Sequence, residues 1–381
     1  MLRNFCCLLG VVLFALRALC AEPPAAKVVD LKAPDGTVLK ATYFAAAKPG
    51  PGVLLMHQCN RDRSMWNGLA PKLAAEGINV LTLDFRGFGE SGGTPPYKLA
   101  TAQEANKMLT EVFPGDVDIA FTYLTAQAGV QKDVIGAAGA SCGVNQSVQL
   151  ARRHKEVKSL VLLSGFTDRD GRLFLKSSPV PIFGSAADDD TGAVDQMEWL
   201  VDISANNASV FQHYANGGHG IEMFAPHPEL NGLILDWFNT TLIKTPGKAP
   251  ERSARLRQYP GLLDMLDSPG GAAKVGEMLA KARKENPRAQ LFPEYGANIL
   301  GYEHLAAGDT QGALEIFKLN IAANPNSPNV YDSLADAYVV TGDKELARQN
   351  AQKAIDMLAT DTSDAEVRKK AIRDSAEQKL K

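Results

Sequence analysis

The sequence predicts an α/β protein in which helices cover both faces of a mostly parallel sheet, followed by a small all-α module. Two observations lead to this prediction. Between residues 27 and 243, short apolar runs of strand length alternate with longer segments of helical spacing. Farther along, the chain repeats itself with a period of 34 residues. With 381 residues, 45% of them hydrophobic, the chain can bury one full α/β core and a small helical module.

The sequence predicts a hairpin, six core strands and four helices in the α/β part. The chain opens with a predicted β-hairpin that turns at residues 34–36. Between two later strands, residues 164–180 read as a short polar link. The expected core strands are residues 52–56, 79–85, 134–138, 157–163, 179–187 and 209–214. The expected helices are residues 65–76, 102–126, 143–155 and 226–241.

Residues 139–143, Gly-Ala-Ser-Cys-Gly, follow the apolar run at 134–138 and form a G-x-S-x-G pattern between a strand and a helix. In this pattern a strained turn lifts the serine hydroxyl clear of the sheet, and the small flanking residues leave room for neighbouring strands. Ser141 is therefore the candidate nucleophile. A five-residue match also fits an ordinary strand end rich in small residues, so the prediction depends on finding an acid and a base in the chain.

Both groups follow Ser141 in the order that this chemistry needs. A serine hydroxyl is a weak nucleophile unless a base takes its proton, and a carboxylate must fix the tautomer of that base. One apolar run leads into three aspartates at residues 188–190, and a later run leads into His219 among three glycines. We expect His219 to be the general base and Asp190 to orient it. Asp188 stays open as the alternative, and the remaining aspartates have solvated or helix-capping roles.

Residues 27–243 resemble the α/β-hydrolase superfamily, near its dienelactone hydrolase-like and esterase branches. Residues 84–91 are similar to its D-x-R-G-x-G-x-S segment, and residues 57–60 resemble its H-G-x oxyanion segment. The resemblance implies a serine hydrolase that cleaves an ester, lactone or thioester through an acyl-enzyme. Dienelactone hydrolases carry a cysteine where this chain has Ser141, which favours esterase-type chemistry. Gln58 also departs from the glycine usual in the oxyanion segment.

Two backbone N–H groups are needed to meet the negative oxygen that forms when a carbonyl is attacked. One donor follows the nucleophile and is therefore Cys142. By resemblance the second donor belongs to Cys59 or, as the weaker alternative, Gln58. The resemblance gives His57 a structural role in bracing this loop.

The N-terminus is typical of a secretory signal peptide over residues 1–21. Arg3 precedes an apolar stretch at 5–16, and small residues follow up to Ala21. The apolar stretch is too short for a membrane span of about 20 residues. We expect cleavage near Ala21 and a periplasmic or secreted protein, with a lipid-anchored Cys20 as the weaker alternative.

Removal of this segment leaves only Cys59 and Cys142, and both fall at the expected oxyanion hole. Donors that converge on one oxygen can bring their Cα atoms within about 7 Å, which a disulfide can span. Exported compartments are oxidising. The sequence therefore suggests a disulfide across the site, with two small buried thiols as the alternative.

Beyond the α/β part we expect a linker and an irregular helical segment at residues 244–290, tetratricopeptide-like repeats at 291–358 and a charged capping helix at 359–381. Fewer than three such repeats are rarely stable alone, so we expect them to dock on the α/β part and to offer a surface for a protein or peptide partner. The residues that recur after 34 positions are Leu300 and Leu334, Gly308 and Gly342, Asp309 and Asp343, and Ala313 and Ala347.

Composition and motifs exclude several classes of function. The chain contains no H-E-x-x-H motif, no paired C-x-x-C motifs and no phosphate-binding glycine-rich loop, so we expect neither a metal nor another cofactor. The net charge of −3 gives no reason to expect nucleic acid as a partner. The leading prediction is a small-molecule ester as substrate. A peptidase or acyltransferase with the same triad, and an exported scaffold with secondary or lost catalysis, are the alternatives.

Overall fold

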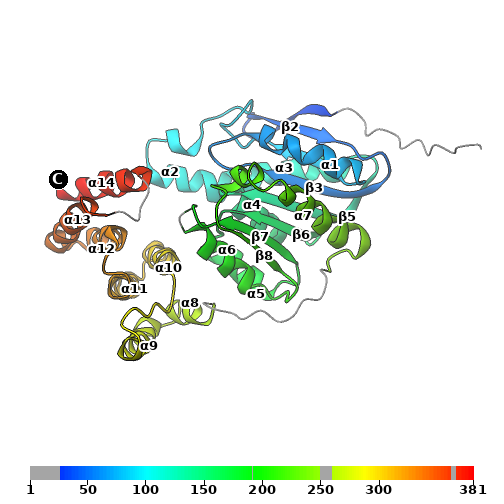
Figure 1. Ribbon diagram of the computed structural model, residues 1–381. Coiled ribbons are helices and arrows are strands. Elements are labelled where there is room, and N and C mark those ends of the chain that lie inside the picture. Colours follow the sequence, from blue (N-terminus) through cyan, green and yellow to red (C-terminus); the bar gives the residue numbers. More distant parts are fainter. Residues whose placement is uncertain (1–25, 191, 249–259, 362–365) are drawn as a thin grey trace, which may run out of the picture.

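One eight-stranded sheet forms the centre of the N-terminal part in the computed structural model, which describes residues 26–190, 192–248, 260–361 and 366–381 (Figure 1). Its strand order is β1-β2-β4-β3-β5-β6-β7-β8. β2 pairs antiparallel with β1 and β4, and every other pairing is parallel, which confirms the predicted mostly parallel sheet. The strands are β1 Lys27–Lys32, β2 Val38–Phe44, β3 Gly50–Met56, β4 Asn79–Leu83, β5 Val130–Ala140, β6 Val157–Leu163, β7 Ile182–Ala187 and β8 Val210–Tyr214.

Helices cover both faces of this sheet. Because side chains alternate along a strand, Val53 and Leu55 of β3 enter the core under α1 and α7, whereas Leu54 and Met56 enter the core under α3 to α6. The helices of this part are α1 Ala70–Ala75, α2 Ala102–Lys107, α3 Phe113–Ala126, α4 Cys142–Arg153, α5 Arg169–Ser177, α6 Ala193–Asp202 and α7 Glu229–Phe238. Short 3-10 and π-helical turns complete it at Arg63–Gly68, Pro96–Lys98, Met108–Val112, Gly220–Phe224 and Asn239–Lys244.

The segment predicted as a short polar link contains α5, so that prediction was wrong. Asp168 caps the helix by accepting a hydrogen bond from the backbone N–H of Gly171. Only part of the helix is buried, including Leu175, and Arg169 and Asp170 make its start look like a loop. The nine residues of α5 do carry an amphipathic helical pattern, but the helix is short and rich in charged residues.

The C-terminal region is helical throughout the residues that the structure describes, and two of its helix pairs repeat in detail. Gly308 and Gly342 have φ of +81° and +83°, and the aspartate that follows each glycine caps the next helix. The equivalent alanines, Ala313 and Ala347, are both buried. The helices are α8 Pro260–Leu266, α9 Gly271–Glu285, α10 Glu294–Ala306, α11 Thr310–Ala323, α12 Pro328–Thr341, α13 Lys344–Leu358 and α14 Glu366–Leu380.

These helices dock on the α/β part, as expected, with α10 against α6 (Figure 1). Phe292 and Leu300 share one hydrophobic core with Leu175 of α5 and Trp199 of α6. A buried ion pair joins Arg172 of α5 to Glu303 of α10. The two regions are therefore packed together through both apolar and charged contacts.

Some expectations fall on residues that the structure does not describe. The predicted signal peptide, residues 1–21, lies outside the described residues. So do residues 249–259 of the predicted linker and irregular helical segment and residues 362–365 of the predicted capping helix. No helix among the described residues has both the length and the apolar character to cross a membrane.

Candidate active site

Ser141 occupies a sharp turn between β5 and α4, with φ of 53° and ψ of −119°. Such a conformation is strained for a residue with a side chain, as the G-x-S-x-G pattern predicts. A Cβ at Gly139 would collide with the carbonyl of Gly143, and a Cβ at Gly143 would lie 2.6 Å from the Met56 carbonyl oxygen. The two glycines therefore let the turn form against the end of β3.

The three consecutive aspartates after β7 have three different partners. Asp188 pairs with His213 at an exposed position, with 2.7 Å between Oδ1 and Nε2. Asp189 accepts hydrogen bonds from the backbone N–H groups of Gly217 and Gly218, which lower the pKa of its carboxyl group. Asp190 Oδ2 lies 2.7 Å from Nδ1 of His219. The pairing expected for the orienting acid is thus made by Asp190.

His219 lies in the turn after β8, next to the turn that carries Ser141. A Cβ added to Gly220 would lie 3.3 Å from the Cβ of Ala140, the residue before Ser141. The hydrogen bond with Asp190 outweighs partial burial and raises the pKa of His219 above its ordinary value of 6.5. Because Nδ1 faces Asp190, Nε2 is the ring nitrogen left to exchange a proton with a serine.

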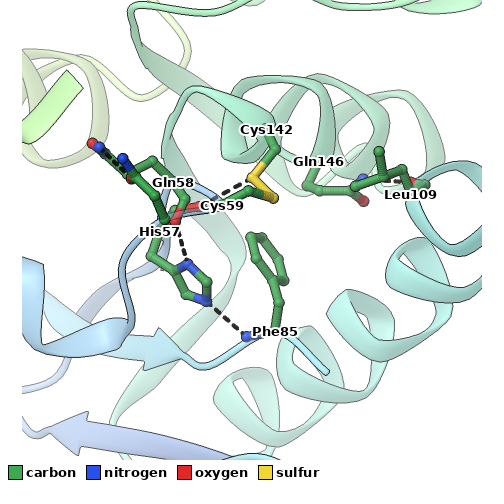
Figure 2. Close-up of a disulfide and its surroundings, with 8 residues drawn as sticks. His57, Gln58, Cys59, Phe85, Leu109, Cys142 and Gln146 are labelled. Carbon is green, nitrogen blue, oxygen red and sulfur yellow. Dashed lines mark hydrogen bonds between the residues drawn. A yellow bond between two sulfur atoms is a disulfide. The ribbon is translucent and has the colours of Figure 1, made fainter. Parts of the chain in front are cut away.

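His57, at the end of β3, has the bracing role that the resemblance implies (Figure 2). Its Nε2 accepts the backbone N–H of Phe85 at 2.9 Å, so Nδ1 carries the proton and donates to the Gln58 carbonyl at 2.8 Å. Burial lowers the pKa of His57, which keeps the ring neutral. The C=O of Gln58 and the N–H of Cys59 belong to one planar peptide and point in opposite directions, so His57 also fixes the direction of that N–H.

Gln58 fills the position where related proteins have glycine, and its side chain is buried. Its Oε1 accepts the backbone N–H of Ile221 at 2.9 Å, and its Nε2 donates to Asn60 at 2.8 Å. Gly220 has φ of +61° and lies so close to Gln58 that a Cβ there would collide with the amide oxygen. Gln58 thus joins the loop after β3 to the histidine turn, a contact that sequence reasoning missed.

A disulfide joins Cys59 to Cys142, with 5.9 Å between the two Cα atoms (Figure 2). It links the loop after β3 to the first residue of α4, directly after Ser141. The suggestion of a disulfide across this site is therefore confirmed. Within the part of the chain that the structure describes, no protein acceptor takes the backbone N–H of Cys59 or Cys142, so both remain available to a ligand oxygen.

The D-x-R-G-x-G-x-S segment holds the surrounding loops in place. The Asp84 carboxylate accepts the backbone N–H groups of Arg63 and Glu90, and a Cβ at Gly89 would collide with that carboxylate. Arg86 forms a two-bond ion pair with Asp116 of α3, with 2.9 Å and 2.8 Å between donor and acceptor atoms. These contacts are structural, because none of them involves a reacting atom.

The described residues contain no cluster of three or more His, Cys, Asp or Glu side chains able to hold a metal ion. A hydroxyl in a strained turn, an imidazole oriented by a carboxylate and two unengaged N–H groups are the elements of nucleophilic acyl transfer.

Comparisons with known proteins agree with this architecture. Residues 51–206 match the family model described as alpha/beta hydrolase fold. Two uncharacterized proteins from two strains of Mycobacterium tuberculosis are each 32% identical to the chain over 146 residues, which is 38% of this chain. The chain spans about half the length of these curated relatives, 47% of each.

Solved structures similar to the chain include two esterases. The Pyrococcus furiosus esterase Pf2001 is 16% identical with a TM-score of 0.48, and the match covers 57% of this chain and 91% of that one. An esterase from Exiguobacterium antarcticum is 16% identical with a TM-score of 0.45, covering 55% of this chain and 99% of that one.

The chain therefore has an α/β-hydrolase fold with a mostly parallel eight-stranded sheet, followed by an all-helical C-terminal region. The fold supports a hydrolase, and the groups at the site determine the reaction.

Proposed function

We propose that the protein is a serine hydrolase that cleaves a carboxylic ester, lactone or thioester through an acyl-enzyme on Ser141. One observation carries the proposal. The imidazole of His219 is hydrogen-bonded to Asp190 at 2.7 Å in a turn that packs against the strained turn of Ser141. A serine, then a carboxylate and then a histidine along the chain are the recurring triad of this fold.

In the proposed reaction, Ser141 Oγ attacks the substrate carbonyl carbon while His219 Nε2 takes the hydroxyl proton. The negative oxygen of the tetrahedral intermediate accepts hydrogen bonds from the N–H groups of Cys59 and Cys142. His219 then gives the proton to the leaving alcohol or thiol, and an acyl-enzyme remains. A water molecule attacks this ester with His219 again as base, and the proton finally returns to Ser141 as the acid product leaves.

Asp190 stays ionised in this scheme and stabilises the imidazolium that forms when the proton is on His219. The serine in place of the cysteine of dienelactone hydrolases supports esterase-type chemistry within a dienelactone hydrolase-like branch. A peptidase or an acyltransferase with the same triad is the alternative enzyme, since the same acyl-enzyme can form from an amide or be attacked by an alcohol.

The test is active-site labelling with a fluorophosphonate probe together with hydrolysis of short-chain p-nitrophenyl esters. We expect Ser141→Ala and His219→Ala each to abolish labelling and to lower kcat by roughly 10⁴-fold or more. His213→Ala is the matched control, because His213 makes the same kind of aspartate pair outside the site and its loss should leave turnover intact.

Absence of labelling in the folded wild-type protein would reject the hydrolase proposal. It would favour an exported scaffold whose helical region binds a protein or peptide.

We also propose that α10 to α13 are tetratricopeptide-like and offer a surface for such a partner. Their glycine turns, aspartate caps and buried alanines recur after 34 residues.

We also propose that the protein is exported to the periplasm or the medium. The N-terminal pattern of Arg3 followed by an apolar stretch supports this location, and so does the disulfide, since disulfides persist in oxidising compartments. Fractionation of the native cells with an antibody against the protein tests it.

A further inference from the structure

The disulfide connects the two residues whose backbone N–H groups are the proposed oxyanion donors. Cys59 and Cys142 are 83 residues apart in the chain and belong to separate elements, the loop after β3 and the start of α4. A covalent bond between them limits how far one N–H group can move relative to the other. It acts at the point where the proposed reaction depends most on geometry.

We infer that the Cys59–Cys142 disulfide is a positioning element of the oxyanion hole, so that full activity requires the oxidised protein. The inference rests on the proposed function and adds a redox requirement to it. Two donors stabilise an oxyanion only when both lie about 2.7 to 3.1 Å from the place where that oxygen forms. A loop that samples other positions loses part of this stabilisation in the transition state.

The loop after β3 faces the histidine turn on one side and the Ser141 turn on the other, and different contacts hold it on the two sides. Toward the histidine turn, noncovalent contacts hold the loop after β3, through Gln58 to the N–H of Ile221 and through Arg61 to Glu222. The Arg61–Glu222 pair is half exposed, so it contributes little to holding the loop in place. Toward the nucleophile, Gly143 packs against the backbone at the end of β3, and the disulfide is the covalent link between the Cys59 loop and the start of α4.

We expect a reductant to reach the bridge. Both cysteines are only partly buried, unlike Ala140 and Gly143 beside them. A phosphine such as TCEP reduces a disulfide in a reaction that also consumes one water molecule, whose oxygen ends on phosphorus. The sulfur–sulfur bond takes up two electrons and two protons to give two thiols, and the phosphine becomes its oxide. No other group is consumed, so among the described residues, which include no further cysteine, the reduced protein differs from the oxidised one only at these two sulfur atoms.

The experiment compares the oxidised protein, the TCEP-reduced protein and the Cys59→Ser/Cys142→Ser variant in p-nitrophenyl ester hydrolysis. The double variant keeps both backbone N–H groups and removes only the bridge. We expect kcat to fall roughly tenfold in both unbridged forms while KM changes little, because an oxyanion hole acts on the transition state. TCEP should have no effect on the double variant.

The affinity for a trifluoromethyl ketone inhibitor is a second measurement, and it would not change if the disulfide only stabilised the fold. Its adduct with Ser141 carries a negative oxygen in the oxyanion hole, so its affinity should fall about as much as kcat. Phe317→Leu is the control for lost stability, because Phe317 is buried among the C-terminal helices and lies outside the site. At equal loss of thermal stability this variant should keep wild-type kcat.

Wild-type kcat and inhibitor affinity in the folded double variant would overturn the inference. So would a kcat loss that Phe317→Leu reproduces at equal stability. Failure of the proposed function itself is distinguishable, since the oxidised wild-type protein would then show neither labelling nor turnover.

Discussion

Asp190 sets both the tautomer and the pKa of His219. The imidazole must be neutral to accept the serine proton, and the Asp190 hydrogen bond raises its pKa above the ordinary value. Activity should therefore rise with pH through that raised pKa and be low below it, where His219 is protonated. The acidic limb of the kcat/KM profile reports this pKa in the free enzyme.

Replacing the acid tests this assignment. In Asp190→Asn the charge and the correct tautomer are lost, so we expect kcat to fall by roughly 10³- to 10⁴-fold and the remaining acidic limb to move to lower pH. The measurement is a pH series of p-nitrophenyl ester hydrolysis. Asp188→Asn is the matched control, because Asp188 pairs with His213, and a large loss of kcat there instead would show that Asp190 is the wrong acid.

The side chain of Gln58 holds the histidine turn through the Ile221 N–H. Gln58→Ala removes the acceptor of the Ile221 N–H and empties the space beside Gly220, so the histidine turn loses its buried contact with the oxyanion loop. We expect about a tenfold lower kcat with KM nearly unchanged. Asn60→Ala removes only the other hydrogen bond of the Gln58 amide and should have a much smaller effect. Equal losses in the two variants would contradict a specific role for the Ile221 contact.

The sequence predicted a serine, a histidine and an aspartate at the site, but it could not show which partner each of the three consecutive aspartates contacts. Their side chains meet different partners because of the pairing of β7 with β8, in which Ala187 lies opposite Tyr214. A shift of one residue in that register would exchange the partners. The signal for Gln58 was present as a departure from glycine, but its contact with Ile221 joins residues 163 positions apart, which no local pattern can show.

At the scale of elements, α5 provides the main charged contact with the C-terminal helices. Arg172 donates to Glu303 of α10 and to the Thr167 carbonyl, and its guanidinium lies 4.7 Å from the ring of Trp199. The arginine side chain is 5% exposed and the glutamate 20%, so water screens this pair little. The sequence could not reveal the contact, since α5 itself was expected to be a loop.

Removing one partner of this pair should be costly. Glu303→Ala leaves a buried guanidinium without its carboxylate, and we expect the free energy of unfolding to fall by about 3 kcal/mol in urea titrations. Lys176→Ala breaks a more exposed pair between the same two regions, Lys176 with Asp264, and should cost less than about 1 kcal/mol. Similar costs for the two variants would show that the Arg172 pair is no better protected from water than the Lys176 pair.

At the scale of the whole molecule, the two regions share one hydrophobic core. The period of 34 residues was enough to predict repeated helix pairs, and the recurring alanines Ala313 and Ala347 marked where the second helix of each pair packs closely. The docking face was beyond sequence reasoning, because the residues of the core shared by α10 and α6, such as Leu300 and Trp199, look like ordinary core positions. Tyr295 of α10 also packs on Gly192, two residues after Asp190.

A chain shortened to end at residue 248 tests what this docking contributes. It would expose Leu175 and Trp199 to water and remove Tyr295 from the turn of Asp190. We expect the Tm to fall by roughly 10 °C, since each large apolar side chain contributes about 2 to 3 kcal/mol when buried. We also expect a lower kcat at temperatures where the shortened chain is folded, because the acid loses a neighbour that holds its turn.

Tyr295→Ala in the full-length protein separates the two effects. This variant keeps the shared core of Leu300 and Trp199 and removes only the ring that contacts Gly192. A kcat loss close to that of the shortened chain, with a much smaller drop in Tm, would show that α10 supports the Asp190 turn directly. Wild-type kcat in both proteins would contradict that support, and the helical region would then contribute to stability without influencing the reaction.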